Sequence, residues 1–98
     1  MKYIILYLED CPYSENAERL LKEKKLNYAK LTFTDKLSSD NAQNVEIPLL
    51  DNKSYYISNN RLDKKIFKDF FGEDATFPRV YEGDNLIGGY TELKEKLD

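Results

Sequence analysis

The sequence predicts an α/β fold whose elements follow the order β-α-β, an undefined middle segment, and then α-β-β-α. Three observations support this fold class. A buried-strand pattern near the start is followed by helical periodicity and a second strand, which together predict a βαβ unit with a right-handed crossover. Two short strand-like runs later in the chain surround a glycine turn, as in a hairpin. An amphipathic segment after the hairpin predicts a further helix.

The first third of the chain contains the predicted βαβ unit. Residues 2–8, KYIILYL, are almost all apolar, as in a strand that is buried on both faces. In the helix that follows, Tyr13 and Ala17 lie four residues apart on an apolar face. Pro12 suits the first helical position because its missing N–H has no partner there. Residues 28–33, YAKLTF, alternate in polarity and predict the second strand.

The middle of the chain, residues 34–59, matches no single pattern. Its polar first half suits a loop or a short helix, whereas its second half has strand-like residues around a turn at Asp51-Asn52. From residue 60 on, apolar side chains recur four residues apart, which predicts a helix that ends before Gly72.

The last part of the chain predicts a hairpin and a helix. Residues 79–89, RVYEGDNLIGG, indicate two short strands around a turn near Gly83-Asp84. The helix over residues 91–97 is expected to begin at Thr91, because a threonine hydroxyl suits the N-cap position.

Composition limits the classes of function. The 98 residues suit a single domain, 1–98, and 41% hydrophobic with 34% charged residues are typical of a soluble globular protein. A net charge of −3 gives no basic surface for nucleic acid or anionic lipid. The absence of histidine excludes Cys/His zinc sites and His-dependent triads within one chain, and a single cysteine excludes an internal disulfide. The apolar run at 3–8 is too short for a membrane span, and we expect no signal peptide.

The single cysteine, Cys11, lies between the end of the first strand and the start of the first helix. Ligand sites in open α/β sheets lie at the carboxyl ends of strands. The N–H groups of a helix N-terminus favour a thiolate, which is the nucleophile in disulfide exchange. Cys11 is therefore a candidate reactive thiol, although a lone cysteine is most often a small buried apolar residue. Ser14 is placed to donate its hydroxyl to the thiolate but cannot take part in a dithiol.

Two motifs of the chain resemble glutaredoxins. CPYS at residues 11–14, followed by an amphipathic helix, resembles their Cys-Pro-Tyr-Cys active site. TFPRVYEGDNLIGGYTEL at residues 76–93 resembles their Thr-Val-Pro strand, hairpin, Gly-Gly and final helix. The resemblance covers residues 2–33 and 60–98 and looks most like small viral and phage glutaredoxins. It implies a thioredoxin fold, β-α-β-α-β-β-α, with a mixed four-stranded sheet flanked by helices and an extra segment at about 34–59.

The resemblance also implies roles for particular residues. Cys11 would be the catalytic nucleophile, with Ser14 in place of the second active-site cysteine, which leaves the monothiol route. Pro78 would be a cis proline, and the backbone of Phe77 would pair with an extended glutathionyl substrate. Glutathione would be the co-substrate, and no metal is expected. The residues implied to bind glutathione are Tyr13, Thr76, Phe77, Pro78, Gly89, Tyr90, Thr91 and Glu92.

The chain departs from the glutaredoxin pattern at positions that carry charge. Thr91 and Glu92 match positions that hold the γ-glutamyl end of glutathione. Leu8 and Ala75, in contrast, stand where family members usually have basic residues. Because glutathione is an anion at neutral pH, these two changes predict a weak affinity for it.

Two other functions stay open beside the leading hypothesis of a glutathione-dependent thiol-disulfide oxidoreductase. Two copies of Cys11 and two glutathione molecules would complete the ligand set of an iron–sulfur carrier dimer, although proline after the cysteine is unfavourable for this in the family. The other is a redox-inactive binding module that keeps only the fold. For the oxidoreductase, the expected partners are glutathione and glutathionylated or disulfide-bonded proteins, with ribonucleotide reductase as a target suggested by the family. We expect a monomer in the cytoplasm, that of the host if the protein is viral, without nucleic-acid or membrane partners.

Overall fold

The computed structural model describes residues 2–98, which form two compact units. Unit 1 comprises the chain up to Leu31 together with Thr76–Asp98, and unit 2 is Thr32–Ala75. The prediction of one domain over residues 1–98 stays a prediction. None of the helices in the described residues is long and apolar enough to cross a membrane.

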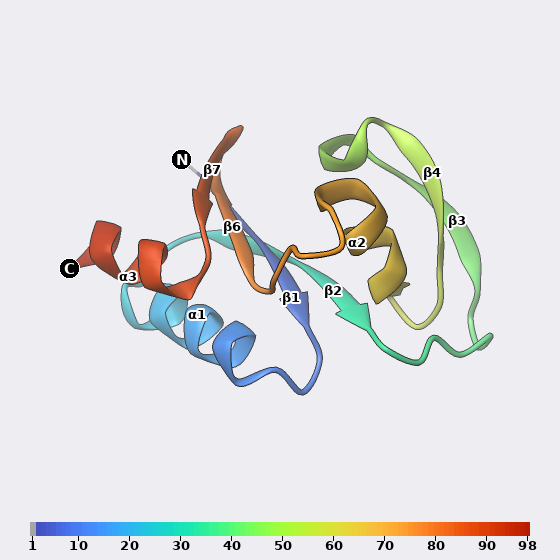
Figure 1. Ribbon diagram of the computed structural model, residues 1–98, viewed down its shortest axis with the longest axis horizontal. Helices are drawn as coiled ribbons and strands as arrows, with labels where there is room; N and C mark the ends of the chain where they lie inside the picture. The colour runs from blue at the N-terminus through green and yellow to red at the C-terminus, as the bar shows by residue number, and fades with distance from the viewer. Residues whose placement is uncertain (1) are drawn as a thin grey trace. The chain divides into compact units, whose positions relative to one another are not determined.

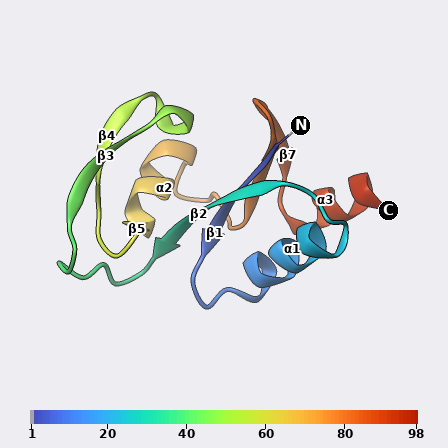
Figure 2. The same ribbon diagram turned by 180° about the vertical axis from the view of Figure 1, so that it is seen from behind.

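Unit 1 consists of strands with two helices packed on them. Its elements are β1 (Tyr3–Leu8), α1 (Pro12–Glu23), β2 (Tyr28–Thr34), β6 (Arg79–Glu82), β7 (Asn85–Gly88) and α3 (Tyr90–Leu97), of which β2 continues into unit 2. Strand β6 pairs antiparallel with both β1 and β7. The pairing of Leu6 with Arg79 places the end of β1 beside the start of β6. Figures 1 and 2 show α1 and α3 side by side.

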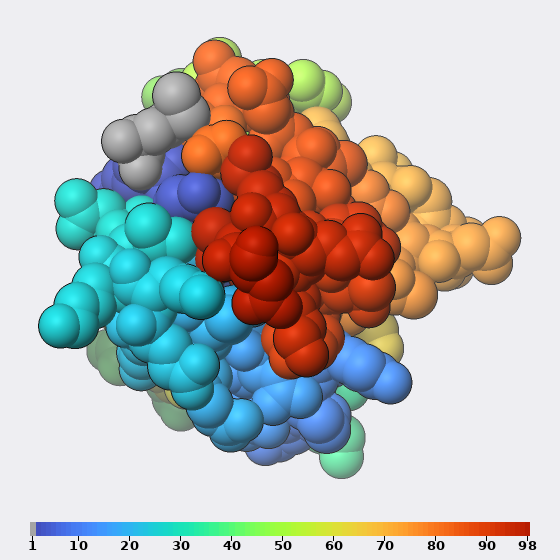
Figure 3. All heavy atoms as spheres, turned by 90° about the vertical axis from the view of Figure 1, so that its left-hand side faces the viewer, coloured from blue at the N-terminus to red at the C-terminus, as the bar shows by residue number. Residues whose placement is uncertain are grey.

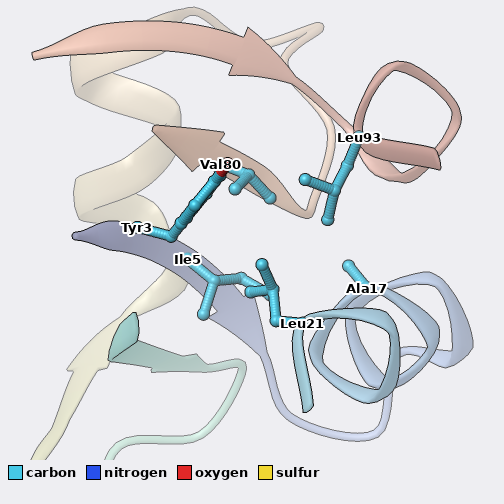
Figure 4. Packing of buried hydrophobic residues seen from close by; sticks show 6 residues of the cluster. All are labelled: Tyr3, Ile5, Ala17, Leu21, Val80 and Leu93. Carbon is cyan, nitrogen blue, oxygen red and sulfur yellow. The ribbon is translucent and has the colours of Figure 1, made fainter. Parts of the chain in front are cut away.

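The core of unit 1 lies between its strands and these two helices. Figure 4 shows side chains from β1, β6, α1 and α3 that point toward one another. They are Tyr3, Ile5, Ala17, Leu21, Val80 and Leu93, none more than 6% exposed. In Figure 3 the red atoms of α3 lie directly against the light-blue atoms of α1. Removal of this apolar surface from water holds both helices on the sheet.

Unit 2 contains a separate hairpin, a short strand and a helix. Its elements after the end of β2 are β3 (Gln43–Ile47), the 3-10 helix η1 (Pro48–Leu50), β4 (Lys53–Ile57), β5 (Arg61–Asp63) and α2 (Lys64–Phe71). Strands β3 and β4 pair antiparallel as a two-stranded sheet. Strand β5 pairs parallel with the last three residues of β2. Phe33 of β2 packs edge-on against Phe67 of α2, with ring centroids 5.6 Å apart.

The α/β class with a mixed sheet is confirmed, but the larger sheet has five strands in the order β5-β2-β1-β6-β7 rather than four. The additional strand, β5, occupies residues where the apolar pattern predicts a helix. Asn59 and Asn60 have φ values of 51° and 64°, so the chain turns sharply before Arg61–Asp63. This turn lets β5 run parallel to β2, and pairing with a distant strand outweighs the local helical pattern.

Helix α2 consequently begins at Lys64, later than its sequence pattern predicts. Asp63 is its N-cap, and the Asp63 carboxylate accepts a hydrogen bond from the Lys65 N–H at 2.9 Å. Gly72 follows the helix with φ 109°, which confirms the predicted glycine at the helix end.

Both predicted turns are confirmed. Asp51 and Asn52 have φ values of 65° and 55°, and they connect η1 to β4. Gly83, with φ 61°, and Asp84 connect β6 to β7 as a hairpin. The polar half of the middle segment contains no helix before β3, so the loop alternative is the correct one.

Candidate functional site

Cys11 is the N-cap residue of α1, with φ −109° and ψ 114°. It follows β1 after a short turn in which Asp10 has φ 61°. The Cys11 carbonyl accepts the N–H of Glu15 at 3.0 Å, and Pro12 is the first helical residue. The cysteine itself is partly buried. The predicted position between the end of a strand and a helix N-terminus is therefore confirmed.

Ser14 connects the first turn of α1 to the end of β1. It is fully buried, and its Oγ accepts a hydrogen bond from the Leu8 N–H at 3.1 Å. This bond closes the short loop that carries Cys11. The predicted catalytic contribution of Ser14 stays a prediction, whereas its structural contribution follows from this contact.

Ser14→Ala should therefore lower the free energy of unfolding by about 1–3 kcal/mol, because the Leu8 N–H loses its acceptor in a partly buried position. Urea unfolding of the wild-type and variant chains measures the difference. Ser54→Ala, which removes an exposed hydroxyl from β4, is the control and should change stability by less than about 0.5 kcal/mol. Equal effects of the two substitutions would show that the Ser14 hydrogen bond contributes nothing.

Acidic side chains surround the end of β1. Burial raises the pKa of the Tyr7 hydroxyl, and nearby negative charges raise it further. Those charges belong to Glu15, Glu18, Glu9 and Asp10. Lys30 partly balances them, because its Nζ lies 4.6 Å from the centroid of the Tyr7 ring. The Tyr7 hydroxyl therefore lies in a locally negative environment, which Lys30 offsets in part.

All eight residues that the resemblance implies as glutathione-binding line one groove of about 480 Å³. They come from the first turn of α1 (Tyr13), the segment before β6 (Thr76, Phe77 and Pro78) and the start of α3 (Gly89, Tyr90, Thr91 and Glu92). Small-molecule sites typically enclose about 300–1,000 Å³, so the groove has room for a molecule the size of a tripeptide. The structure thus brings these residues together, while their role in binding stays a prediction.

The walls of the groove differ in exposure. The Phe77–Pro78 peptide bond is cis, as the resemblance implies, and Phe77 is only 9% exposed. Tyr13, in contrast, is 63% exposed. An aromatic ring of this kind offers a large apolar contact area together with a polar hydroxyl.

Gly88 and Gly89 are required by the packing of the chain itself. Gly88 has φ 130°, and a Cβ there would lie 2.8 Å from Cγ of Glu92. A Cβ at Gly89 would lie 3.3 Å from the carbonyl oxygen of Pro78. Glycine at both positions therefore lets the start of α3 approach the segment that precedes β6.

Helix α3 begins at Tyr90, and its N-cap is Gly89 rather than Thr91. The predicted cap is wrong because Glu92 supplies the capping interaction: its Oε1 accepts the Gly89 N–H at 2.7 Å. Thr91 lies exposed in the first turn and lines the groove.

A second hollow, of about 190 Å³, adjoins the groove and shares four of its residues. The shared residues are Thr76, Pro78, Gly89 and Glu92. The hollow is also lined by Gly88 and by Arg79.

Comparison with known proteins relates the chain to others by structure. Neither protein-family models nor curated sequences match it significantly. The structure is similar to that of glutaredoxin 1 from Francisella tularensis, solved as a complex with cacodylate, with a TM-score of 0.63 and 20% sequence identity. The similarity covers 99% of this chain and 92% of that one. At this identity the likeness establishes the fold, and the chain therefore has a glutaredoxin-like thioredoxin fold.

Proposed function

We propose that the chain is a glutathione-dependent thiol-disulfide oxidoreductase that uses Cys11 as its nucleophile through the monothiol route. The observation that carries this proposal is the groove, which is lined by Tyr13, two residues after Cys11, by the cis-proline segment and by the start of α3. The likeness of the fold to that of glutaredoxin 1 supports it.

The reaction proceeds in two exchanges. The Cys11 thiolate attacks the glutathionyl sulfur of a mixed disulfide between glutathione and a target thiol. A bond forms between Cys11 and glutathione, the bond to the target breaks, and the target thiolate leaves and takes a proton from solvent. The thiolate of a second glutathione then attacks the bound glutathionyl sulfur, which releases oxidised glutathione and restores the Cys11 thiolate. The target is reduced by two electrons, which glutathione supplies.

The groove offers suitable contacts for this substrate. The backbone beside the cis proline would pair with an extended peptide, and the exposed ring of Tyr13 would cover its apolar part. The N-terminus of α3 and the Thr91 hydroxyl would attract a carboxylate. We propose glutathionylated proteins as targets and a cytoplasmic monomer as the acting form.

The proposal is tested with the wild-type chain and a glutathionylated peptide. Without free glutathione, intact-mass measurement should find one glutathionyl group attached to Cys11. After reduced glutathione is added, oxidised glutathione should accumulate at a rate proportional to the protein concentration. The rate at which Cys11 becomes glutathionylated is compared with that of the cysteine in an unstructured peptide with the same loop sequence. A slower reaction of Cys11 would contradict the proposal and favour a redox-inactive binding module.

A further inference from the structure

Unit 2 contains a hollow of its own, between α2 and β4, that the proposed reaction does not use. It has a volume of about 250 Å³, and it is lined by Lys53, Tyr55, Ile66, Asp69 and Phe70. None of these residues lines the groove of unit 1. Strand β4 also belongs to residues 34–59, the segment that the glutaredoxin motifs leave unmatched. The α2–β4 hollow is therefore a feature that the resemblance does not account for.

The aromatic side chains of the α2–β4 hollow are held in place by contacts within unit 2. Phe70 is 37% exposed, and its ring packs edge-on against Phe71 with centroids 4.9 Å apart. Phe71 in turn contacts the ring of the fully buried Phe67, with centroids 4.8 Å apart. On β4, the Tyr55 hydroxyl donates a hydrogen bond to the Leu50 carbonyl at 3.0 Å. Because these rings are already fixed, contact with a partner would cost them little conformational entropy.

The charged side chains of the hollow come from different elements. Lys53 is the first residue of β4 and Asp69 lies in α2, and both are exposed. Within residues 2–98, neither side chain forms an ion pair. The hollow thus offers one positive and one negative group together with an apolar lining.

We infer that the α2–β4 hollow is a docking site for an extended segment of a partner protein, in which one large apolar side chain lies between an acidic and a basic residue. The acidic residue would meet Lys53, the basic residue would meet Asp69, and the apolar side chain would contact Tyr55, Ile66 and Phe70. Small-molecule sites typically enclose about 300–1,000 Å³, so the size of this hollow suits a single side chain better. An aromatic anchor that fills a small pocket is typical of contacts between proteins.

Titration of the wild-type chain with the acetylated and amidated tripeptide Asp-Trp-Lys, followed by NMR, tests this docking site. The tripeptide should shift the methyl signals of Ile66 and the ring signals of Phe70. Asp-Ser-Lys, which lacks the ring, should leave these signals unchanged. Ser-Trp-Ser should bind about two- to fivefold more weakly for each of the two charges that it lacks. The tripeptides contain no thiol, so the result does not depend on the chemistry of Cys11.

Three outcomes of this titration would overturn the inference. The first is the absence of any shift at Ile66 and Phe70. The second is equal affinity for Asp-Trp-Lys and Ser-Trp-Ser, because the two charges of the hollow would then contribute nothing. The third is equal affinity for Asp-Trp-Lys and for acetylated tryptophan amide, which would indicate a small aromatic ligand in place of a polypeptide.

Variants of the hollow provide a second, independent test. Asp69→Lys should reverse the charge preference, so that Asp-Trp-Asp binds about two- to fivefold more tightly than Asp-Trp-Lys. Phe70→Ser should abolish the shift at Ile66. Tyr56→Ser is the matched control, because it removes a 44% exposed aromatic residue of β4 that does not line the hollow, and it should leave binding unchanged. An unchanged preference in Asp69→Lys, or equal losses in Phe70→Ser and Tyr56→Ser, would contradict the docking site.

Discussion

The Cys11→Ser variant is expected to lose thiol-disulfide exchange, to below roughly a thousandth of the wild-type rate. The chain has one cysteine, so no other sulfur can form the mixed disulfide with glutathione. A serine hydroxyl at neutral pH is a far weaker nucleophile than a thiolate. Formation of oxidised glutathione from a glutathionylated peptide and free glutathione measures the loss.

The fold of this variant should remain intact, which makes the loss interpretable. Serine is among the preferred N-cap residues, and Cys11 makes no side-chain capping hydrogen bond that the substitution would remove. The free energy of unfolding should therefore stay within about 0.5 kcal/mol of the wild-type value. Turnover close to the wild-type rate in the folded variant would contradict the role of Cys11 and, with it, the proposed oxidoreductase.

Leu93→Ala is expected to lower the free energy of unfolding by about 2–5 kcal/mol, because it leaves a cavity in the core of unit 1. Leu93 is fully buried and points toward side chains of β1, β6 and α1 (Figure 4). Such a loss is large beside the total stability of a small domain, which is typically about 5–15 kcal/mol. Urea unfolding at constant pH, with the slope compared between the two chains, measures it.

Leu86→Ala is the matched control for this substitution. Leu86 lies in β7 of the same unit but is 46% exposed, so its truncation should cost less than about 0.5 kcal/mol. Leu93 also directly follows Glu92 in α3, so a loosened helix should weaken substrate binding in the groove. Equal losses of stability for the two leucines would show that Leu93 does not hold α3 on the sheet.

Several features were predictable because they depend on interactions within a few residues. Pro12 and the strand before it locate the start of α1, so Cys11 at its N-cap follows from the local sequence. Gly83-Asp84 and Asp51-Asn52 set turns by their tolerance of positive φ. The residues of the groove, in contrast, were indicated only by the resemblance of two motifs to glutaredoxins, and these motifs lie more than sixty positions apart in the chain.

Other features required the packed chain. The pattern from residue 60 has helical spacing, yet Arg61–Asp63 form β5, because the parallel partner strand supplies hydrogen bonds that no local pattern shows. Thr91 has the chemistry of an N-cap, but the helix begins two residues earlier, where the Gly89 carbonyl accepts the Leu93 N–H and the Glu92 carboxylate accepts the Gly89 N–H. In both places, hydrogen bonds that the local pattern does not show decide where the helix begins.

By itself, the sequence determined the α/β fold class and the placement of the one thiol at a helix N-terminus, because capping, turn chemistry and apolar periodicity are local. The tertiary structure alone decided that Ser14 is buried against the Leu8 N–H and that Arg79 lines a hollow beside the groove. Burial and the position of a side chain depend on which distant strands pair and in which register, and that register is set by contacts across the whole unit.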